Sequence, residues 1–250
     1  MDTKETTTYY AVLIAAAVIG TIIIYFIVSV FRQQRKHRFL YKAYIESEIA
    51  TLEKERARIA ADLHDELGPT LSAAKFKLGS IDSATGDDVK MITDSVQYID
   101  TIIQQLRLIA NDLMPKTLLR YGAVSAIEEF IHHMSANSTL KISFHHNNVP
   151  ALPQSQAIHI YRILQEIIHN TIKHANATQL KIKMFRLKNK LIIATVDDGK
   201  GFDYVSVNAQ KNGLGLSNLQ SRTDMLSGEI HISSGAGKST HYTIRIPLID

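Results

Sequence analysis

The sequence predicts three consecutive parts: one membrane-spanning helix, an antiparallel hairpin of two long helices, and an α/β sandwich with helices on one face of a mixed sheet. Three observations support this prediction. Residues 6–31 carry no charged side chain, residues 92–113 repeat apolar side chains at heptad spacing, and residues 140–247 mix alternating strand-like segments with helical ones. A chain of 250 residues is long enough for two modest domains.

The uncharged segment is long enough to cross a membrane. Residues 9–31 are almost continuously apolar, and roughly 20 such residues span the hydrocarbon of a bilayer. A cleaved signal peptide is the alternative, but the run is too long for one and its basic residues follow rather than precede it. By the positive-inside rule the side after the helix is cytoplasmic, since it begins with Arg32, Arg35, Lys36 and Arg38. Residues 1–8 are then a short extracytoplasmic N-terminus with no room for a sensing domain.

Composition excludes several kinds of site. The chain has no cysteine, so it forms no disulfide, no zinc–thiolate site and no thiol nucleophile. Its net charge of +4 owes much to the basic cluster after the apolar run. Because that cluster lies where a membrane-anchored protein carries one, we expect no direct nucleic-acid binding.

Residues 32–114 are predicted to form the helical hairpin. One long helix covers residues 32–80, the composition of residues 79–88 indicates a turn, and the second helix carries an apolar seam in steps of four and three residues. A single hairpin cannot cover its own apolar stripe, so we expect two chains to pair into a four-helix bundle. The alternative is a hairpin packed against the C-terminal domain of its own chain. The seam consists of Ile92, Val96, Ile99, Ile103, Leu106, Ala110 and Leu113.

One histidine of the first hairpin helix is distinguished by its surroundings. His64 has acidic neighbours at Asp65 and Glu66, and it points about 100° around the helix from the apolar face that includes Leu63. Gly68 and Pro69 follow within about one turn, although a helix interior loses roughly 1 and 3 kcal/mol to these residue types. The pattern indicates a functional histidine, and a surface histidine on a charged coiled coil is the alternative.

The C-terminal part is predicted to contain a linker and then the sandwich. Pro115 and Gly122 suggest a linker over residues 115–122, and the domain fills residues 123–250. Its predicted helices are residues 123–136, 155–174 and 214–226, and its predicted strands are residues 140–146, 179–187, 191–196, 229–233 and 241–247.

A polar stripe marks the helix of residues 155–174. Glu166, Asn170, Lys173 and His174 fall at i, i+4, i+7 and i+8 on a helix that is otherwise strongly apolar. A buried helix satisfies such a stripe by lining a cavity or binding a ligand. The stripe offers an amide oxygen for a hard cation and an ammonium group for phosphate, although a solvated helix face would show the same pattern.

Two glycine-containing segments follow. Asp197 directly follows a predicted strand, where its carboxylate could accept a hydrogen bond from an exocyclic amine, and Gly199 and Gly201 allow a backbone to approach a flat ring. Gly213 and Gly215 open the next helix, where backbone N–H groups face phosphate oxygens. Each pattern is weak alone, because turns also use glycine, and neither is a Walker loop or a full Rossmann fingerprint.

Together and in this order, the segments resemble a sensor histidine kinase of a two-component system, in the subfamily that partners NarL/LuxR-type response regulators. RIAADLHDELGPTLS resembles its phosphoacceptor box, YRILQEIIHNTIKHANAT its N box, and VDDGKGF and NGLGLSNLQSR its two glycine boxes. The resemblance covers about residues 50–247. It implies a HisKA_3-type dimerisation domain followed by a HATPase_c domain of the GHKL ATPase type.

The resemblance also implies catalytic roles. His64 would be the phosphoacceptor that attacks the γ-phosphate of ATP, and Asp65 would hold its imidazole or take its proton. Asn170 would ligate Mg²⁺ with Glu166 in support. Lys173 and His174 would lie near the phosphates.

The remaining implied roles concern the nucleotide and the partners. Asp197 would receive the adenine amine beside Gly199 and Gly201, while Gly213 and Gly215 would flank the phosphates under a lid of residues 202–212. A homodimer in the bacterial inner membrane would pass its phosphoryl group to an aspartate of a separate regulator. The alternatives are a membrane-tethered ATP-binding scaffold without phosphotransfer and a Ser/Thr kinase of the same ATPase superfamily.

The sequence departs from the subfamily at Pro69. The subfamily often has a glutamine five residues after the histidine, where it positions water for dephosphorylation of the regulator, so this phosphatase activity is in doubt here. A proline at this place lacks the N–H that would bond the Asp65 carbonyl, and we expect it to kink the helix beside His64. Our hypothesis is that this bend is a mechanical joint for signalling.

Overall fold

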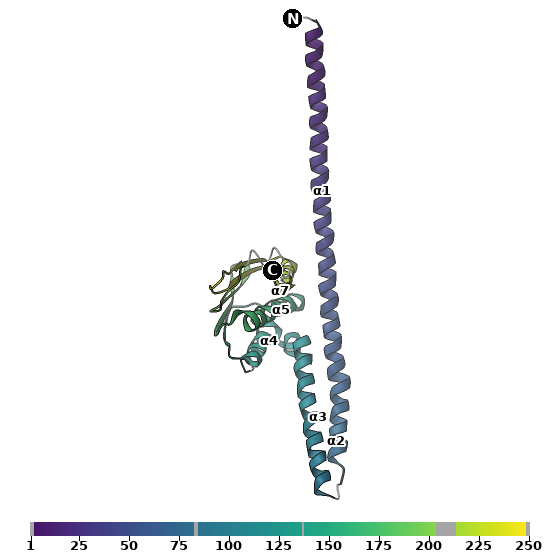
Figure 1. Cartoon of the computed structure of the whole chain (residues 1–250), viewed down its shortest axis with the longest axis vertical. Coiled ribbons are helices and arrows are strands. Elements are labelled where there is room, and N and C mark those ends of the chain that lie inside the picture. The colour runs from purple at the N-terminus through teal and green to yellow at the C-terminus, as the bar shows by residue number, and fades with distance from the viewer. Residues whose placement is uncertain (1–2, 83–84, 137, 204–213, 249–250) are drawn as a thin grey trace. The chain divides into compact units, whose positions relative to one another are not determined.

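The computed structural model describes residues 3–82, 85–136, 138–203 and 214–248, shown in Figure 1. For residues 3–18, 38, 42 and 214 it describes the backbone and not the side chains. The chain divides into two compact units, Met1–Leu52 and Glu53–Asp250. The functional residues predicted above all belong to the second unit.

The first helix, α1, spans Thr3–Asp62. Within the described part of the chain, we find no helix with both the length and the apolar character that a membrane crossing requires. A spanning helix is predicted for residues 9–31, and the structure does not describe the side chains of its first part, residues 9–18. It therefore stays a prediction.

The predicted hairpin is present. After α1 come a π-helical turn, η1 (Leu63–Leu67), and helix α2 (Gly68–Gly79), and α3 (Gly86–Leu113) returns beside them (Figure 1). Thr85 caps α3, because its hydroxyl accepts the N–H of Asp88 at 3.2 Å. No residue of η1, α2 or α3 is buried among those described, so the apolar seam is only partly covered within one chain.

The helix before Pro69 contains a π turn that includes His64, and the predicted kink itself stays a prediction. The N–H of Gly68 bonds the carbonyl of Leu63, five residues earlier, because the missing N–H of proline interrupts the α-helical ladder. The hydroxyl of Thr70 bonds the carbonyl of Glu66 at 2.7 Å and supplies a donor on the same turn. His64 thus sits on an irregular turn rather than on a regular α-helix.

The segment predicted as a linker is largely helical. Helix α4 covers Lys116–Ala136, and its only non-helical residue is Gly122, which has a φ of 82° and a ψ of −173°. Pro115 directly precedes the first helical residue, a place where the fixed φ of proline favours a helix, and Leu118 anchors the first turns with 2% of its surface exposed. Gly122 therefore interrupts the segment, and two helical stretches meet at a kink there.

The sandwich has the predicted mixed sheet. Its strand order is β1-β2-β3-β5-β4, with β1 parallel to β2 and every other pair antiparallel. The strands are β1 (Lys141–Asn147), β2 (Gln179–Leu187), β3 (Lys190–Asp197), β4 (Glu229–Ser233) and β5 (His241–Pro247). The helices are α4, α5 (Gln154–Asn170) with the π turn η2 (Thr171–Ala175), and α7 (Leu214–Met225).

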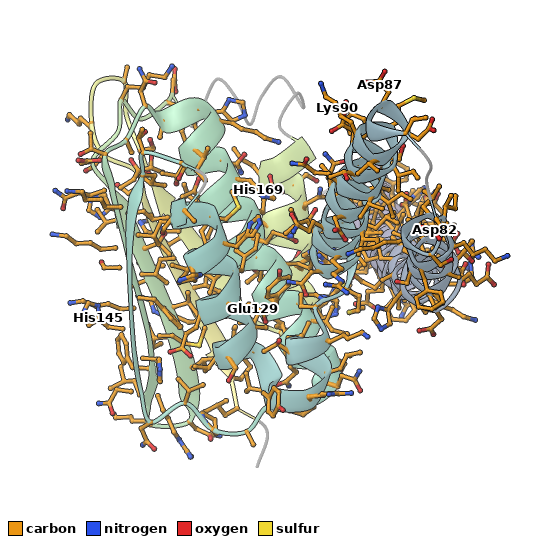
Figure 2. All side chains as sticks on the ribbon, turned by 90° about the horizontal axis from the view of Figure 1, so that it is seen from below. Asp82, Asp87, Lys90, Glu129, His145 and His169 are labelled. Atoms are coloured by element: carbon orange, nitrogen blue, oxygen red, sulfur yellow. The ribbon has the colours of Figure 1, made fainter. Side chains whose placement is uncertain are left out.

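These helices cover one face of the sheet, and α5 forms the centre of the core. Figure 2 shows the sheet edge-on with the helices to one side and His145 on the opposite, outer face. Along β2, alternate residues are buried against the helices, as the period of a strand requires. The fully buried core includes Ile160, Ile163, Leu164, Ile167, Ile168, Ile182, Met184, Ile193 and Ile244.

Replacing Pro69 by Ala restores an N–H at the place where an α-helix would bond the Asp65 carbonyl. We expect the π turn to convert to α-helix and the free energy of unfolding to rise by about 1–2 kcal/mol. Circular-dichroism melting and amide hydrogen exchange at Gly68 measure the two effects. Lys77→Ala, at an exposed position of α2 that keeps its own N–H, is the control. A melting temperature that stays the same or falls in Pro69→Ala would contradict the explanation.

Candidate active site

Seven of the predicted site residues line one cavity of about 620 Å³ beside the end of α5. The cavity lies between η2, the end of β3 and the start of α7. Its polar walls come from segments that are far apart in the sequence, which the mixed sheet brings together. The predicted residues that line it are Glu166, Asn170, Lys173, His174, Asp197, Gly201 and Gly215.

Asn170 is the last residue of α5, where the helix changes to the π turn η2. Its amide nitrogen donates to Glu166 Oε1 at 2.9 Å, and among the described residues none bonds the amide oxygen. The wider turn that follows places Lys173 and His174 on the cavity wall and exposes both. Asn176, in the left-handed conformation with φ 54°, ends the turn.

Asp197 forms a buried acidic floor with 4% of its surface exposed. Its Oδ1 accepts the N–H of Gly199 at 2.8 Å and that of Thr240 at 3.3 Å, and these described bonds leave Oδ2 for a donor from a ligand. On the same face of β3, the hydroxyl of Thr195 is a described buried side-chain atom without a hydrogen-bond partner. Burial, with Asp197 and Glu166 nearby, raises the pKa of Tyr242 on the cavity wall to about 12.

The glycines of the first glycine segment are required by packing. A Cβ on Gly199 would lie 2.5 Å from the carbonyl oxygen of Ala175, and Gly199 does not line the cavity. Gly201 lines it and has φ +59°, and a Cβ there would lie 2.0 Å from the carbonyl oxygen of Lys238. Gly199 therefore acts by allowing the loop to approach η2, not by facing the cavity.

Gly215 allows the start of α7 to reach the polar stripe. A Cβ there would lie 2.3 Å from Glu166 Oε1 and 3.3 Å from the amide nitrogen of Asn170. Gly213 and residues 204–212 of the predicted lid lie outside the described residues.

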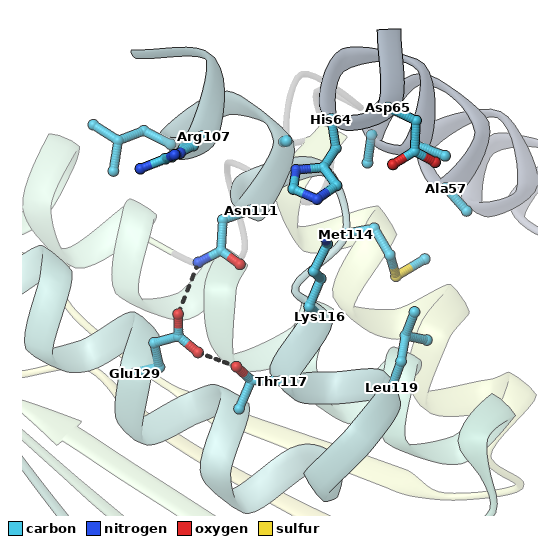
Figure 3. Close-up of a pocket in the computed structure, with 14 residues that line it drawn as sticks. Ala57, His64, Asp65, Arg107, Asn111, Met114, Lys116, Thr117, Leu119 and Glu129 are labelled. Carbon is cyan, nitrogen blue, oxygen red and sulfur yellow. Dashed lines mark hydrogen bonds between the residues drawn. The ribbon is translucent and has the colours of Figure 1, made fainter. Parts of the chain in front are cut away.

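His64 lines a different cavity, of about 570 Å³, between the hairpin and α4 (Figure 3). The imidazole is exposed, as the helical spacing predicts, and Asp65 lies beside it. Arg107 and Lys116 bring two positive charges to the walls, and no described residue forms an ion pair with either of them. Glu129 completes the wall and accepts hydrogen bonds from Asn111, at 3.2 Å, and from Thr117.

The sequence reasoning missed these neighbours of His64. Arg107 and Asn111 are four residues apart and share one face of α3, so their spacing was a usable signal. Lys116 and Glu129 reach the cavity only because α4 begins directly after α3, where a linker was predicted.

The sequence reasoning also missed a buried ionic network centred on Glu53 of α1. Glu53 is 8% exposed, and its carboxylate binds Arg162 of α5 at 3.1 Å and Arg222 of α7 at 2.7 Å. Burial by itself would raise the pKa of Glu53, but the two guanidinium groups outweigh it and hold the pKa below its ordinary value. Burial first, and then the charge of Arg222, lowers the pKa of His159, whose Nδ1 lies 3.5 Å from Arg222.

The cavity beside Asn170 fits a magnesium ion that binds mainly through a ligand's phosphates. Among the described residues, no group of three or more His, Asp or Glu side chains is placed to hold a metal ion. Mg²⁺ commonly keeps several waters and takes few protein oxygens when substrate phosphates supply the rest. The free amide oxygen of Asn170 beside the Glu166 carboxylate matches that requirement.

Two protein families match the chain. The family described as histidine kinase-, DNA gyrase B- and HSP90-like ATPase (HATPase_c) matches residues 155–250, and the histidine kinase family HisKA_3 matches residues 55–118. The first match contains the cavity beside Asn170. The second contains His64 and the hairpin.

Curated relatives resemble most of this chain, but it corresponds to only part of each. Sensor histidine kinase MctS of Rhizobium johnstonii is 27% identical over 216 residues, which cover 84% of this chain and 47% of the relative. Sensor histidine kinase ComP of Bacillus subtilis is 29% identical over 206 residues, which cover 78% of this chain and 27% of the relative.

A solved structure, the histidine kinase domain of the blue-light activated histidine kinase from Erythrobacter litoralis EL346, aligns with a TM-score of 0.46 and 18% identity. The alignment covers 74% of this chain and 96% of that one.

Gly215→Ala tests the close approach of α7. The added Cβ displaces Glu166 and Asn170, so we expect nucleotide affinity to fall roughly tenfold, which corresponds to about 1.4 kcal/mol. Titration with a fluorescent ATP analogue measures the dissociation constant. Gly86→Ala is the matched control, because no heavy atom lies within 4 Å of a Cβ there. Equal affinities for the two variants would count against the role of Gly215.

Proposed function

We propose that this chain, which belongs to the sensor histidine kinases of two-component systems, uses ATP to phosphorylate its own His64 and passes the phosphoryl group to an aspartate of a response regulator. One observation carries the proposal. The chain that presents an exposed His64 on a helical hairpin also gathers Asp197, Asn170 and Lys173 around one cavity. The chain spans about half of MctS and about a quarter of ComP.

In this proposal the cavity positions ATP by its chemistry. The free oxygen of Asp197 accepts the exocyclic amine of adenine, and Lys173 and His174 lie toward the phosphates. Mg²⁺, when bound through the Asn170 amide oxygen, neutralises charge on the phosphate oxygens. Positioning and charge neutralisation account for most catalysis of phosphoryl transfer.

The transfer needs one bond to form and one to break. An imidazole nitrogen of His64 attacks the γ-phosphorus, and the bond from that phosphorus to the β-γ bridging oxygen breaks to release ADP. Asp65 holds the ring or accepts its remaining proton. The regulator's aspartate then takes the phosphoryl group from the imidazole. The family match of the hairpin supports a regulator of the NarL/LuxR type.

Pairing of two chains explains the exposed apolar surface of the hairpin. No described residue of η1, α2 or α3 is buried, although α3 has a continuous heptad seam. Large apolar side chains that stay exposed in one chain include Phe76, Met91, Tyr98, Ile102 and Ile109. A four-helix bundle formed by two hairpins would bury them.

Membrane anchoring rests on the sequence alone. The uncharged residues 9–31 and the basic cluster that follows them support a single-pass protein of the bacterial inner membrane with its domains in the cytoplasm.

His64→Ala separates the kinase from the alternatives. After incubation with γ-labelled ATP we expect acid-labile label on the wild type and none on the variant, because the imidazole is the acceptor. A response regulator added afterwards should remove the label. His145→Ala is the control, since His145 is exposed on β1. Acid-stable label would indicate a Ser/Thr kinase, and nucleotide binding without label would indicate a scaffold.

Deleting residues 1–31 tests the anchor and the dimer together. We expect the chain to move from the membrane pellet to the soluble fraction, while light scattering still gives the mass of two chains. Deleting only residues 1–8 leaves the apolar run intact and should leave the protein in the pellet. A truncated chain that still pellets, or one with the mass of a single chain, would refute the corresponding part.

A further inference from the structure

The geometry points to Glu53 as a positioning residue. Its bonds hold the kinase in an arrangement in which His64 and the nucleotide cavity are apart, and breaking these bonds allows phosphoryl transfer. This inference rests on the proposed kinase function and adds a regulatory contact to it. The contact joins α1, the helix that directly precedes the turn of His64, to the two helices that line the nucleotide cavity.

The contacts of Glu53 are divided between its two carboxylate oxygens. Oε2 receives Nε and Nη2 of Arg162, each at 3.1 Å, and Oε1 receives Nη2 of Arg222 at 2.7 Å. Arg162 is 3% exposed. A carboxylate held by two guanidinium groups in a buried place is strongly paired, and loss of the carboxylate leaves two like charges facing each other.

The bonds of Glu53 belong to a larger group of contacts between α5 and the helical hairpin. Arg162 also donates to the carbonyls of Asp112, at 3.0 Å, and Leu113, and Gln165 donates to the Asp112 carboxylate at 2.6 Å. These bonds tie α5 to the C-terminal end of α3, directly before the ATPase-type domain begins. None of these bonds involves Glu53, so loss of Glu53 would leave the domain tied to α3, while α1 would keep only its apolar contacts at Ala57 and Ala60.

The position of Glu53 also fixes which way His64 faces. Glu53 reaches Arg162 of α5, and His64, which follows α1 on η1, lines a cavity with residues of α4, so both side chains face the C-terminal domain. Glu53 therefore turns the His64 face of α1 toward the domain. A rotation of α1 about its axis would carry both residues away together.

In the arrangement that Glu53 holds, the phosphoacceptor and the nucleotide do not meet. The cavity of His64 is lined from α1, η1, α3 and α4, whereas the nucleotide cavity is lined from α5, η2, β3, α7 and β5, and the two share no lining residue. A nucleophile must come within roughly 3–3.5 Å of the atom that it attacks. For transfer within one chain, the domain must therefore move relative to His64.

Arg222 links the contact to the nucleotide itself. It lies on α7, whose second residue, Gly215, lines the nucleotide cavity against Glu166. Arg162 lies one turn before Glu166 on α5. Both helices that Glu53 holds thus end in residues that line the site of ATP.

Glu53→Gln in the full chain, reconstituted in lipid vesicles, tests the inference. The amide keeps the shape and removes the charge, so we expect the initial rate of His64 labelling at saturating ATP to rise roughly tenfold, as loss of charge-assisted hydrogen bonds predicts. Glu55→Gln is the matched control and should label at the wild-type rate, because Glu55 pairs at the surface with Arg58 at 2.6 Å. A purely structural role for Glu53 would lower the rate instead, and an unchanged or lower rate in Glu53→Gln overturns the inference.

A cross-link tests the same contact in the opposite direction. The chain has no cysteine, so Glu53→Cys with Arg222→Cys offers two unique thiols for a short bismaleimide. The double variant should label at least as fast as the wild type before cross-linking and lose its labelling afterwards, while it still binds a fluorescent ATP analogue. The two single-cysteine variants, treated identically, control for the reagent. Wild-type labelling in the cross-linked protein overturns the inference.

The two proposals fail in different ways. A wild-type chain that binds ATP but never labels His64 refutes the kinase function. A wild-type chain that labels normally, with no gain in Glu53→Gln, refutes only the regulatory contact. Hydrogen exchange of α1 and α7 gives a readout that needs no activity: both helices should exchange faster in Glu53→Gln than in Glu55→Gln.

Discussion

The burial of α5 is the constraint on which the rest of the structure depends. A helix with apolar residues on nearly every face has to satisfy each of its polar side chains, because an unpaired polar group in the core costs roughly 1–3 kcal/mol. Arg162 and Gln165 do so with the hairpin, and Glu166 and Asn170 do so with each other at the cavity. One helix therefore positions both the junction with the hairpin and the candidate nucleotide site.

Both candidate sites lie on π-helical turns. His64 is inside η1, and Lys173 and His174 are inside η2. A π turn inserts one residue into the helical ladder and changes the direction in which the following side chains point. At η1 the cause is visible in the sequence, since Pro69 lacks an N–H, whereas at η2 the turn ends on Asn176 in a left-handed conformation that no single residue type announces.

Local patterns predicted most of the elements and the polar stripe, because periodicity and burial act within one segment. The Glu53 network was beyond such patterns: its partners are 109 and 169 residues away in the sequence, and a glutamate on a charged helix has no local sign of burial. The helical start of α4 was missed for a related reason. Proline and glycine suggested a linker, and the buried side chain of Leu118 that stabilises the helix is a tertiary contact.

Because Glu53 binds residues that are far from it in the sequence, it could couple a change in α1 to phosphoryl transfer at the nucleotide cavity. In the proposed kinase, a signal along α1 would meet Glu53 before His64, and a nucleotide that moved the start of α7 would act on Arg222, which binds the same carboxylate. Coupling between two binding events is reciprocal in free energy. If ATP binding changes the equilibrium constant of the Glu53 contact by some factor, then breaking that contact changes the affinity for ATP by the same factor. A single buried carboxylate can therefore connect the two halves of the molecule without a continuous chain of intermediates between them.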